Sequence, residues 1–93
     1  MQYKHEYGAE LEQLVGKIGK NKPLMREFLF DLLSPAEYQE LAVRWQIIKM
    51  LKSNIPHRDI AKRLKVSVAT ITRGSRELAN KKGGFNLAWR KFY

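Results

Sequence analysis

The sequence predicts an all-α protein of about five to six helices. Along most of the chain, apolar residues recur at steps of three and four, which places them on one face of a helix. A helix-start signal of the form Ser-Pro-x-Glu begins at Ser34 and opens the longest of these stretches. Breaks at residues 21–23 and 53–56 contain Pro and Asn and separate the stretches. We therefore expect a single domain, residues 1–93, built from helices joined by short loops.

The composition limits the classes of protein that the chain can belong to. A domain of 93 residues buries only about 60% of its unfolded surface, so we expect a second subunit to complete the core. The absence of cysteine excludes disulfides and thiol chemistry, and His5 and His57 do not have the spacing of a metal site. We find neither a signal peptide nor an apolar run that spans a bilayer. We expect a cytoplasmic protein with no membrane partner, metal or cofactor.

The net charge of +9 is unevenly distributed. Residues 1–48 hold six Lys/Arg and seven Asp/Glu and carry −1, whereas residues 49–93 hold twelve Lys/Arg and two Asp/Glu and carry +10. A strongly basic half is typical of a protein that binds a polyanion. The alternative is a solvated, solubilising surface, but such a surface normally mixes both signs of charge.

Residues 1–52 are predicted to form a helical dimerisation core. Residues 11–18 and 24–33 each carry an apolar stripe with helical spacing. Between them, Pro23 suits the first turn of the second helix. We expect both stripes to face the core.

A third helix is predicted to begin after Ser34, which is its N-cap. Pro35 fits the first helical position, and Glu37 can reach back to close a capping box. The helix runs to about Lys52 and is apolar on two sides, so we expect another copy of the chain to cover one side. Trp45 on this helix is interpreted as a core residue and not as a ligand-stacking residue.

Residues 53–78 contain two short amphipathic helices. One apolar stripe falls on residues 60–64, and a second begins at Val68 and extends to Leu78. Ala61 provides a small side chain where the two helices must pack closely.

A tight turn joins these two helices. Ser67 suits the N-cap of the second helix, because its hydroxyl can accept a hydrogen bond from a free N–H of the first turn. The turn has no glycine, so Lys65 or Val66 must bend without one. This is the pattern of a helix-turn-helix unit, whose second helix enters the major groove of DNA.

Residues 79–93 form a basic, aromatic tail. A loop with the sequence ANKKGG precedes FNLAWRKFY, in which the apolar residues have a loose helical pattern. We favour a last short helix that packs on the rest of the chain. The alternative is that aromatic residues alternating with Arg90 and Lys91 stack on nucleic acid.

Arg73 and Gly74, in the second short helix, are candidates for a ligand site. A glycine inside a helix costs up to about 1 kcal/mol relative to alanine, which is justified where something must approach the backbone closely. The neighbouring arginine can grip a planar anion with two parallel hydrogen bonds. The alternative is a helix that ends at Gly74, with Arg73 interacting with its last carbonyls. The stripe that continues to Leu78 argues against that ending.

Arg44 is the other candidate, because it lies on an otherwise strongly apolar helix. It can face Arg73 across an aromatic amino acid, whose ring and carboxylate would relieve the repulsion between the two cations. The alternatives are an exposed arginine whose stem covers apolar surface and an ion pair with Glu40.

The segment ATITRGS at residues 69–75 follows the helix-turn-helix pattern and the capped helix that begins after Ser34. Together with Arg44, these features resemble the bacterial Trp repressor family over about residues 24–80. The resemblance implies an intertwined, all-helical homodimer that binds a two-fold symmetric operator in double-stranded DNA. It also implies L-tryptophan as corepressor and control of genes for tryptophan biosynthesis or transport.

The resemblance also implies individual roles for the residues of a tryptophan site. Arg73 would pair with the ligand carboxylate, Gly74 would leave room for the indole, and Arg44 would lie on the other face of the indole. Ser34, in place of a threonine, would help to hold the carboxylate. The implied ligand set is Ser34, Arg44, Thr70, Arg73, Gly74 and Glu77, in which Thr70 lines the wall and Glu77 replaces a serine that holds the amino group.

For DNA, the family uses the start of the second short helix and parts of the first. The expected DNA-contact residues are His57, Arg58, Ala61, Lys62, Lys65, Val68, Ala69, Thr72 and Arg76. Among them, Thr72 and Arg58 are expected to read bases, whereas Lys62, Lys65 and Arg76, together with Lys81 and Lys82, are assigned to phosphates.

We predict a sequence-specific DNA-binding repressor that tryptophan activates by favouring one orientation of the two short helices. One rival is a regulator of the same fold that needs no ligand, and a less favoured rival is a basic RNA-binding module. An enzyme is not expected, because the sequence has no cysteine nucleophile, no paired-carboxylate pattern and no phosphate-cradling glycine loop.

Overall fold

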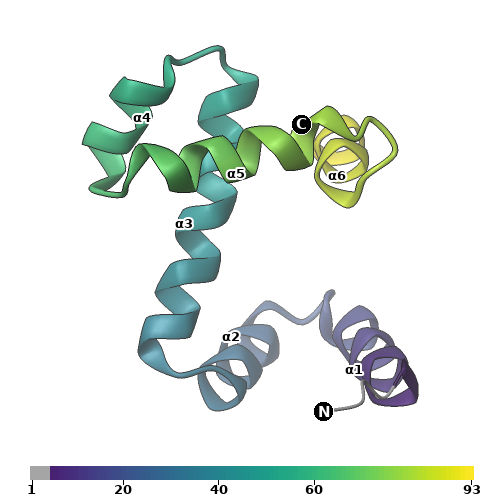
Figure 1. Cartoon of the computed structure of the whole chain (residues 1–93). Coiled ribbons are helices and arrows are strands. Elements are labelled where there is room, and N and C mark those ends of the chain that lie inside the picture. Colours follow the sequence, from purple (N-terminus) through teal and green to yellow (C-terminus); the bar gives the residue numbers. More distant parts are fainter. Residues whose placement is uncertain (1–4) are drawn as a thin grey trace. The chain divides into compact units, whose positions relative to one another are not determined.

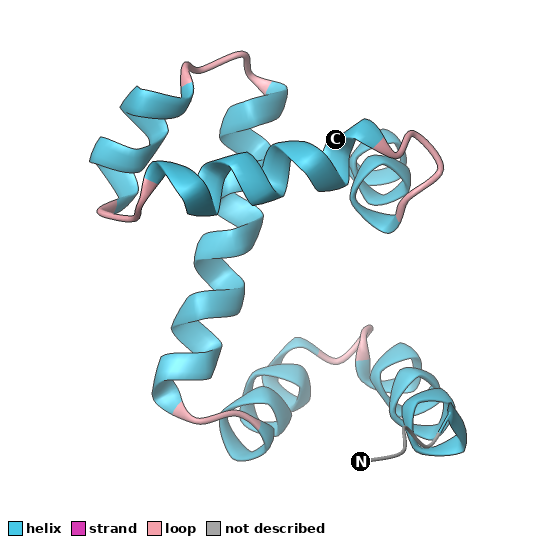
Figure 2. Ribbon diagram, in the orientation of Figure 1, coloured by secondary structure: helices cyan, strands magenta, loops and turns pink. Residues whose placement is uncertain are grey.

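The computed structural model describes residues 5–93, and within this range it contains six helices and no strand (Figures 1 and 2). This confirms the predicted all-α fold class. The helices are α1 (His5–Ile18), α2 (Lys22–Leu32), α3 (Pro35–Lys52), α4 (His57–Leu64), α5 (Val68–Ala79) and α6 (Gly84–Phe92). The chain forms two compact units, one extending to Tyr38 and the other comprising Gln39–Tyr93.

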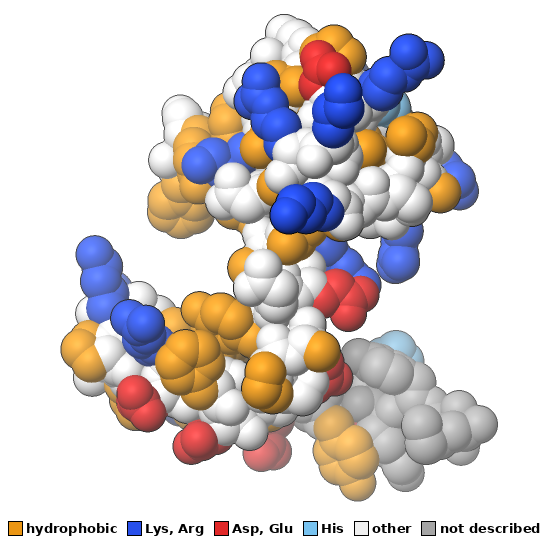
Figure 3. All heavy atoms as spheres, turned by 90° about the vertical axis from the view of Figure 1, so that its left-hand side faces the viewer, with side chains coloured by type: hydrophobic (Ala, Val, Ile, Leu, Met, Phe, Trp, Pro, Cys, Tyr) orange, Lys and Arg blue, Asp and Glu red, His pale blue; other side chains and the backbone are white. Residues whose placement is uncertain are grey.

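The first unit contains α1, α2 and the start of α3. The side chain of Asn21 caps α2 by accepting a hydrogen bond from the Leu24 N–H at 3.2 Å, and Pro23 lies in the first turn, as predicted. Ile18 at the end of α1 is buried, and the rings of Phe30 and Tyr38 lie 4.9 Å apart. Many other apolar side chains of this unit remain exposed in the single chain (Figure 3).

The capping box at the start of α3 is confirmed. The Glu37 N–H donates to Ser34 Oγ at 3.1 Å, and Glu37 Oε1 accepts from the Ser34 N–H at 2.8 Å. The hydrogen bond from the Ser34 backbone N–H, and to a lesser degree the one from the Ser34 side chain, hold the pKa of the Glu37 carboxyl below its ordinary value. The charged form of Glu37 therefore stabilises the helix start.

We expect the substitution Glu37→Gln to reveal this charge through a pH-dependent difference in thermal stability. The stabilisation by Glu37 is fully present above the unfolded-state pKa of about 4.3 and is lost as the pH falls through the lower folded-state pKa. The wild type should therefore melt above Glu37→Gln at pH 7, and the two melting temperatures should converge near pH 3. A difference that stays constant between pH 7 and pH 3 would contradict the role of the charge.

The core of the second unit lies where α3, α4 and α5 meet. Ile47, Ile60, Ala61 and Ile71 form its buried cluster. The partly buried residues packed against this cluster are Val43, Met50, Leu51, Ile55, Leu64 and Val66. The predicted stripe on α4 is thus in the core. On α5, in contrast, Val68 is 50% exposed, because the first turn of this helix extends beyond the packed region.

Two left-handed residues end α3 and α4. Asn54, with φ 60°, lets the Ile55 N–H reach the Met50 carbonyl at 3.1 Å, and Asn is one of the few residues that tolerate this conformation. After α4, Lys65 adopts φ 57° and ψ 45°, and the Val66 N–H reaches the Ala61 carbonyl at 3.1 Å. The turn therefore bends without glycine at Lys65, one of the two residues that the sequence leaves open.

The C-terminal tail forms α6 and packs on α3, which confirms the favoured interpretation. Trp45 Nε1 donates to Tyr93 Oη at 3.0 Å, and the Trp45 ring lies 5.7 Å from Tyr93 and 6.1 Å from Phe85. The rings of Trp89 and Tyr93 are stacked at 4.5 Å. Trp45 is half-buried in this aromatic cluster, so it packs within the chain as predicted.

Candidate nucleic-acid interface and ligand site

The α4–α5 pair has the local structure that the sequence predicts for a helix-turn-helix unit. Ser67 caps α5, because its Oγ accepts from the Thr70 N–H at 3.2 Å, and the Ser67 and Thr70 hydroxyls are hydrogen-bonded to each other at 2.9 Å. α5 continues through Gly74 to Ala79, so the alternative in which the helix ends at Gly74 is wrong.

The exposed start of α5 presents mainly apolar groups. Val68 and Ala69 are exposed and have no polar side-chain atoms. The Thr72 hydroxyl donates to the Val68 carbonyl at 3.1 Å, so in this arrangement its oxygen offers an outside partner only an acceptor. With the Ser67 and Thr70 hydroxyls also paired, the first turn of α5 offers few free donors.

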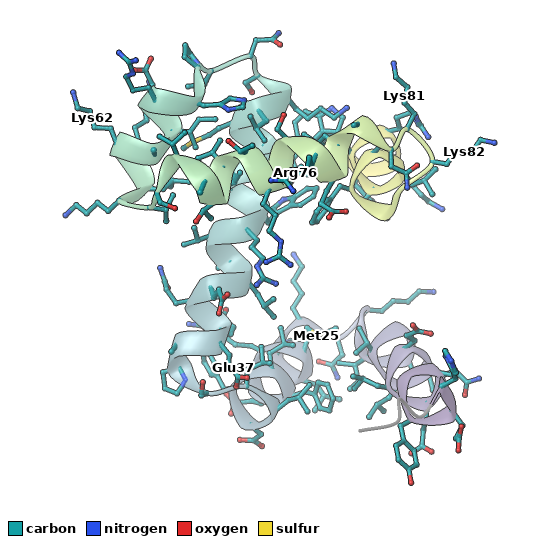
Figure 4. All side chains as sticks on the ribbon, in the orientation of Figure 1. Met25, Glu37, Lys62, Arg76, Lys81 and Lys82 are labelled. Atoms are coloured by element: carbon teal, nitrogen blue, oxygen red, sulfur yellow. The ribbon has the colours of Figure 1, made fainter. Side chains whose placement is uncertain are left out.

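Exposed cationic side chains lie on both short helices and on the turn between them. Arg58 and Lys62 lie on α4, Lys65 lies in the turn, and Arg76 lies further along α5; all four are exposed. Several blue Lys and Arg side chains are spread over the upper part of the molecule in Figure 3, among white and orange groups, and Figure 4 shows Lys62 extending outward. The one ion pair within residues 5–93 joins Arg44 to Glu40, so no carboxylate neutralises these four cations.

The two remaining expected DNA-contact residues differ in exposure. His57, the first residue of α4, is exposed. Ala61 is only 9% exposed and belongs to the core cluster. Its methyl group fills the close approach of α4 to its neighbours, as the sequence predicts for a small residue at this position.

α5 crosses α3 at Gly74. A Cβ atom built on Gly74 would lie 3.0 Å from Ile47 Cγ2 and 3.6 Å from the Cδ1 atoms of Ile48 and Leu51. The close approach inferred from this glycine is therefore made by the side chains of α3.

We expect Gly74→Val to destabilise the protein by about 1–3 kcal/mol, because the added methyl groups have no room beside Ile47. The matched control is Gly16→Val in α1, where nothing lies within 4 Å of an added Cβ. The control should unfold at a denaturant concentration close to that of the wild type. Chemical unfolding that gives Gly74→Val the stability of the wild type would contradict the tight crossing.

The candidate ligand residues of the second unit lie near this crossing. Arg73 precedes Gly74 on α5, and Arg44 lies one turn before Ile47 on α3, so both arginines flank the place where the helices meet. Arg73 is exposed, and its guanidinium makes no hydrogen bond or ion pair with residues 5–93. Arg44 Nη2 donates to Glu40 Oε1 at 2.8 Å, which is one of the alternatives that the sequence leaves open.

The other candidate ligand residues are placed as follows. Thr70 lies in the first turn of α5, and Glu77 is exposed one turn after Arg73. Ser34 belongs to the first unit, where its Oγ accepts from the Glu37 N–H.

Two contributions to the site do not follow from sequence motifs. Ile47 occupies the space above Gly74, and Tyr93 anchors α6 to Trp45 on α3, one residue after Arg44. The only sequence signal for Ile47 is its position three residues after Arg44. For Tyr93 there is no local signal, because its partner is far away in the sequence.

The described part of the chain was also searched for a metal site and for a helix that could cross a membrane. Among residues 5–93 no group of His, Cys, Asp or Glu side chains is placed to hold a metal ion. In the same range, the helices are too short or too polar to cross a bilayer.

The fold and the site define an all-helical protein organised around two short helices joined by a tight turn, with an exposed basic surface. The model of the Trp repressor protein family matches residues 9–92, and the chain belongs to this family. That family consists of regulatory proteins.

Relatives named Trp operon repressor homolog support the assignment. The protein from Actinobacillus succinogenes is 45% identical over 67 residues, which cover 71% of this chain and 65% of that protein. The protein from Haemophilus influenzae strain PittEE is 34% identical over 87 residues, which cover 92% of this chain and 83% of that protein. The protein from Pasteurella multocida is 39% identical over 67 residues, with 71% and 65% covered. No solved structure matches the chain.

Proposed function

We propose that this protein is a sequence-specific, DNA-binding transcriptional repressor whose operator binding is promoted by L-tryptophan. The observation that carries the proposal is the position of α5. Its first turn is exposed and belongs to a helix pair that carries exposed cations without ion pairs, and its middle crosses α3 at Gly74 beside Arg73. The first turn of α5 would therefore contact DNA, and the middle of the same helix would contact the ligand.

Tryptophan has groups that suit the side chains near the crossing. The free guanidinium of Arg73 can bind the carboxylate with two hydrogen bonds. Arg44 can keep its in-plane hydrogen bond to Glu40 and still present a guanidinium face to the indole. Glu77 would pair with the ammonium group, and Thr70 and Gly74 would line the site.

The ligand would act by shifting a population. It would contact α3 and α5 together and would favour the orientation of the α4–α5 pair that fits the major groove. The size of the shift equals the difference between its affinities for the two orientations. In the dimer that we propose, residues 1–52 form the core, residues 53–78 read the operator and residues 79–93 are the tail.

The exposed surface of α5 supports a specific manner of DNA recognition. Val68 and Ala69 suit contacts with thymine methyl groups, and the Thr72 oxygen suits the amino group of an adenine or cytosine. The other members of the DNA-contact set are His57, Arg58, Ala61, Lys62, Lys65 and Arg76. Most of the basic residues among them would bind phosphates, whereas Ala61 sets the packing of α4.

A second function has a specific observation in its favour. Arg44 already has a partner in Glu40, so this arginine needs no ligand to satisfy its charge. A regulator of the same fold that binds DNA without an effector fits this arrangement. Whether tryptophan changes DNA binding separates the two functions.

The test combines calorimetry with selection of DNA from a random duplex library. We expect L-tryptophan to bind the full chain and selection in its presence to enrich a two-fold symmetric sequence. Equal enrichment with and without tryptophan would support the ligand-independent regulator. No enrichment under either condition would overturn DNA-sequence recognition itself.

A further inference from the structure

We infer that the turn between α5 and α6 is a second DNA-contact surface, which binds the phosphate backbone of duplex DNA without reading its sequence. We call it the α5–α6 basic turn, and it consists of Lys81, Lys82 and Arg90. The inference rests on the proposed function, because it assumes that α5 brings the protein to duplex DNA. It extends that function to a part of the chain outside the helix-turn-helix unit.

The first support is charge. Residues 78–93 contain four Lys/Arg residues and no Asp or Glu. None of these four cations is in an ion pair within residues 5–93. Figure 4 shows Lys81 and Lys82 extending outward from the turn. A set of cations of one sign, without acidic partners, attracts a polyanion.

The second support is that hydrogen bonds fix the shape of the turn. The side chain of Asn86, only 4% exposed, donates to the carbonyls of Leu78 at 3.0 Å and Asn80 at 2.9 Å. Asn80 Oδ1 accepts from the Lys82 N–H at 3.2 Å. Arg90 Nη2 donates to the Lys81 carbonyl at 3.3 Å, which brings a third cation to the turn. The backbone that carries the lysines is therefore held in place before any partner binds.

The third support concerns the kind of nucleic acid. Proteins that bind single strands stack bases on free aromatic side chains. In this tail, Phe85, Trp89 and Tyr93 belong to the aromatic cluster around Trp45. Phe92 is exposed, but it lies at the far end of α6 from the turn, so charge is the main property that the turn itself offers, which suits the backbone of a duplex.

The position of the turn relates it to the reading end of α5. The helix has 12 residues and a length of about 18 Å, with Val68 at one end and the basic turn at the other. When the first turn of a recognition helix contacts base edges, its later turns leave the groove. The nearest anions at that end are the phosphates along the groove edge.

The experiment compares the double substitution Lys81→Gln/Lys82→Gln with the wild type. The affinity for duplex DNA is measured by fluorescence anisotropy between 50 and 200 mM salt, on a selected operator and on a random duplex of equal length. If each lysine contacts one phosphate, the slope of log affinity against log salt falls by about 2 for each protomer bound. For each protomer bound, the loss of affinity over this range then becomes about tenfold smaller for both DNAs, and the ratio of the two affinities stays unchanged.

The matched control is Lys20→Gln/Lys22→Gln, which removes two exposed lysines from the first unit. Its salt slope should equal that of the wild type. The inference is overturned if the turn variant also keeps the wild-type slope on both DNAs. A wild type that shows no salt-dependent DNA binding at all would instead overturn the proposed function.

Discussion

Raising the salt concentration from 50 to 200 mM is expected to weaken DNA binding by the wild-type protein at least a thousandfold. A protein that neutralises six or more phosphates releases the corresponding counterions, and added salt opposes this release. Residues 49–93 carry a charge of +10, and the exposed cations of α4 and α5 have no carboxylate partner within residues 5–93. Their charges are therefore available to phosphates.

The individual contributions can be separated by single substitutions. Arg58→Gln and Lys62→Gln should each lower the slope of log affinity against log salt by about 0.9 for every phosphate that the side chain neutralises. Arg26→Gln, on α2 of the first unit, is the control and should leave the slope unchanged. A wild-type slope near zero would show that binding does not depend on phosphate contacts.

Replacing Arg73 with alanine is expected to weaken tryptophan binding by well over tenfold. Hydrogen bonds to charged groups contribute about 1.5–3 kcal/mol, and the guanidinium can make two of them to one carboxylate. The Arg73 guanidinium makes no hydrogen bond or ion pair within residues 5–93, so it does not have to break an existing interaction to bind the ligand. Calorimetric titration with L-tryptophan measures the effect.

The control for this substitution is Arg76→Ala, which removes an exposed cation of the same helix. It should change the affinity for tryptophan by less than a factor of two. Tryptamine, which lacks the carboxylate, should bind wild type and Arg73→Ala alike. An Arg73→Ala protein that binds tryptophan as tightly as the wild type would remove Arg73 from the site, and a wild type that does not bind would remove tryptophan from the proposal.

The helices and their ends could be predicted from the sequence because the signals are local. Helical periodicity and capping act over about one turn, so the capping box of Ser34 and Glu37 and the Ser67 cap are visible in the sequence. Because the turn after α4 has no glycine, Lys65 or Val66 must adopt the conformation that bends the chain. The backbone dihedral angles of the structure show that this residue is Lys65. Local signals restrict such choices to a few residues.

Val68 is predicted from the sequence both as part of an apolar stripe and as a DNA-contact residue. Its spacing to Ile71 suggests a shared core face, but Ile71 is fully buried and Val68 is half-exposed. Periodicity shows which residues share a helix face and does not show how far along the helix the packing extends. The length of α5 that is packed depends on how far α3 and α4 extend along this helix.

By itself, the sequence determined the helical class, the order of the helices, their caps and the concentration of positive charge in residues 49–93. Only the tertiary structure decided that Ile47 fills the space above Gly74, that Arg44 pairs with Glu40, and that Tyr93 binds Trp45. The physical reason is the separation in sequence of the interacting residues. A cap or an apolar stripe involves residues only a few positions apart. A contact between two helices depends on their crossing position, which the whole core sets.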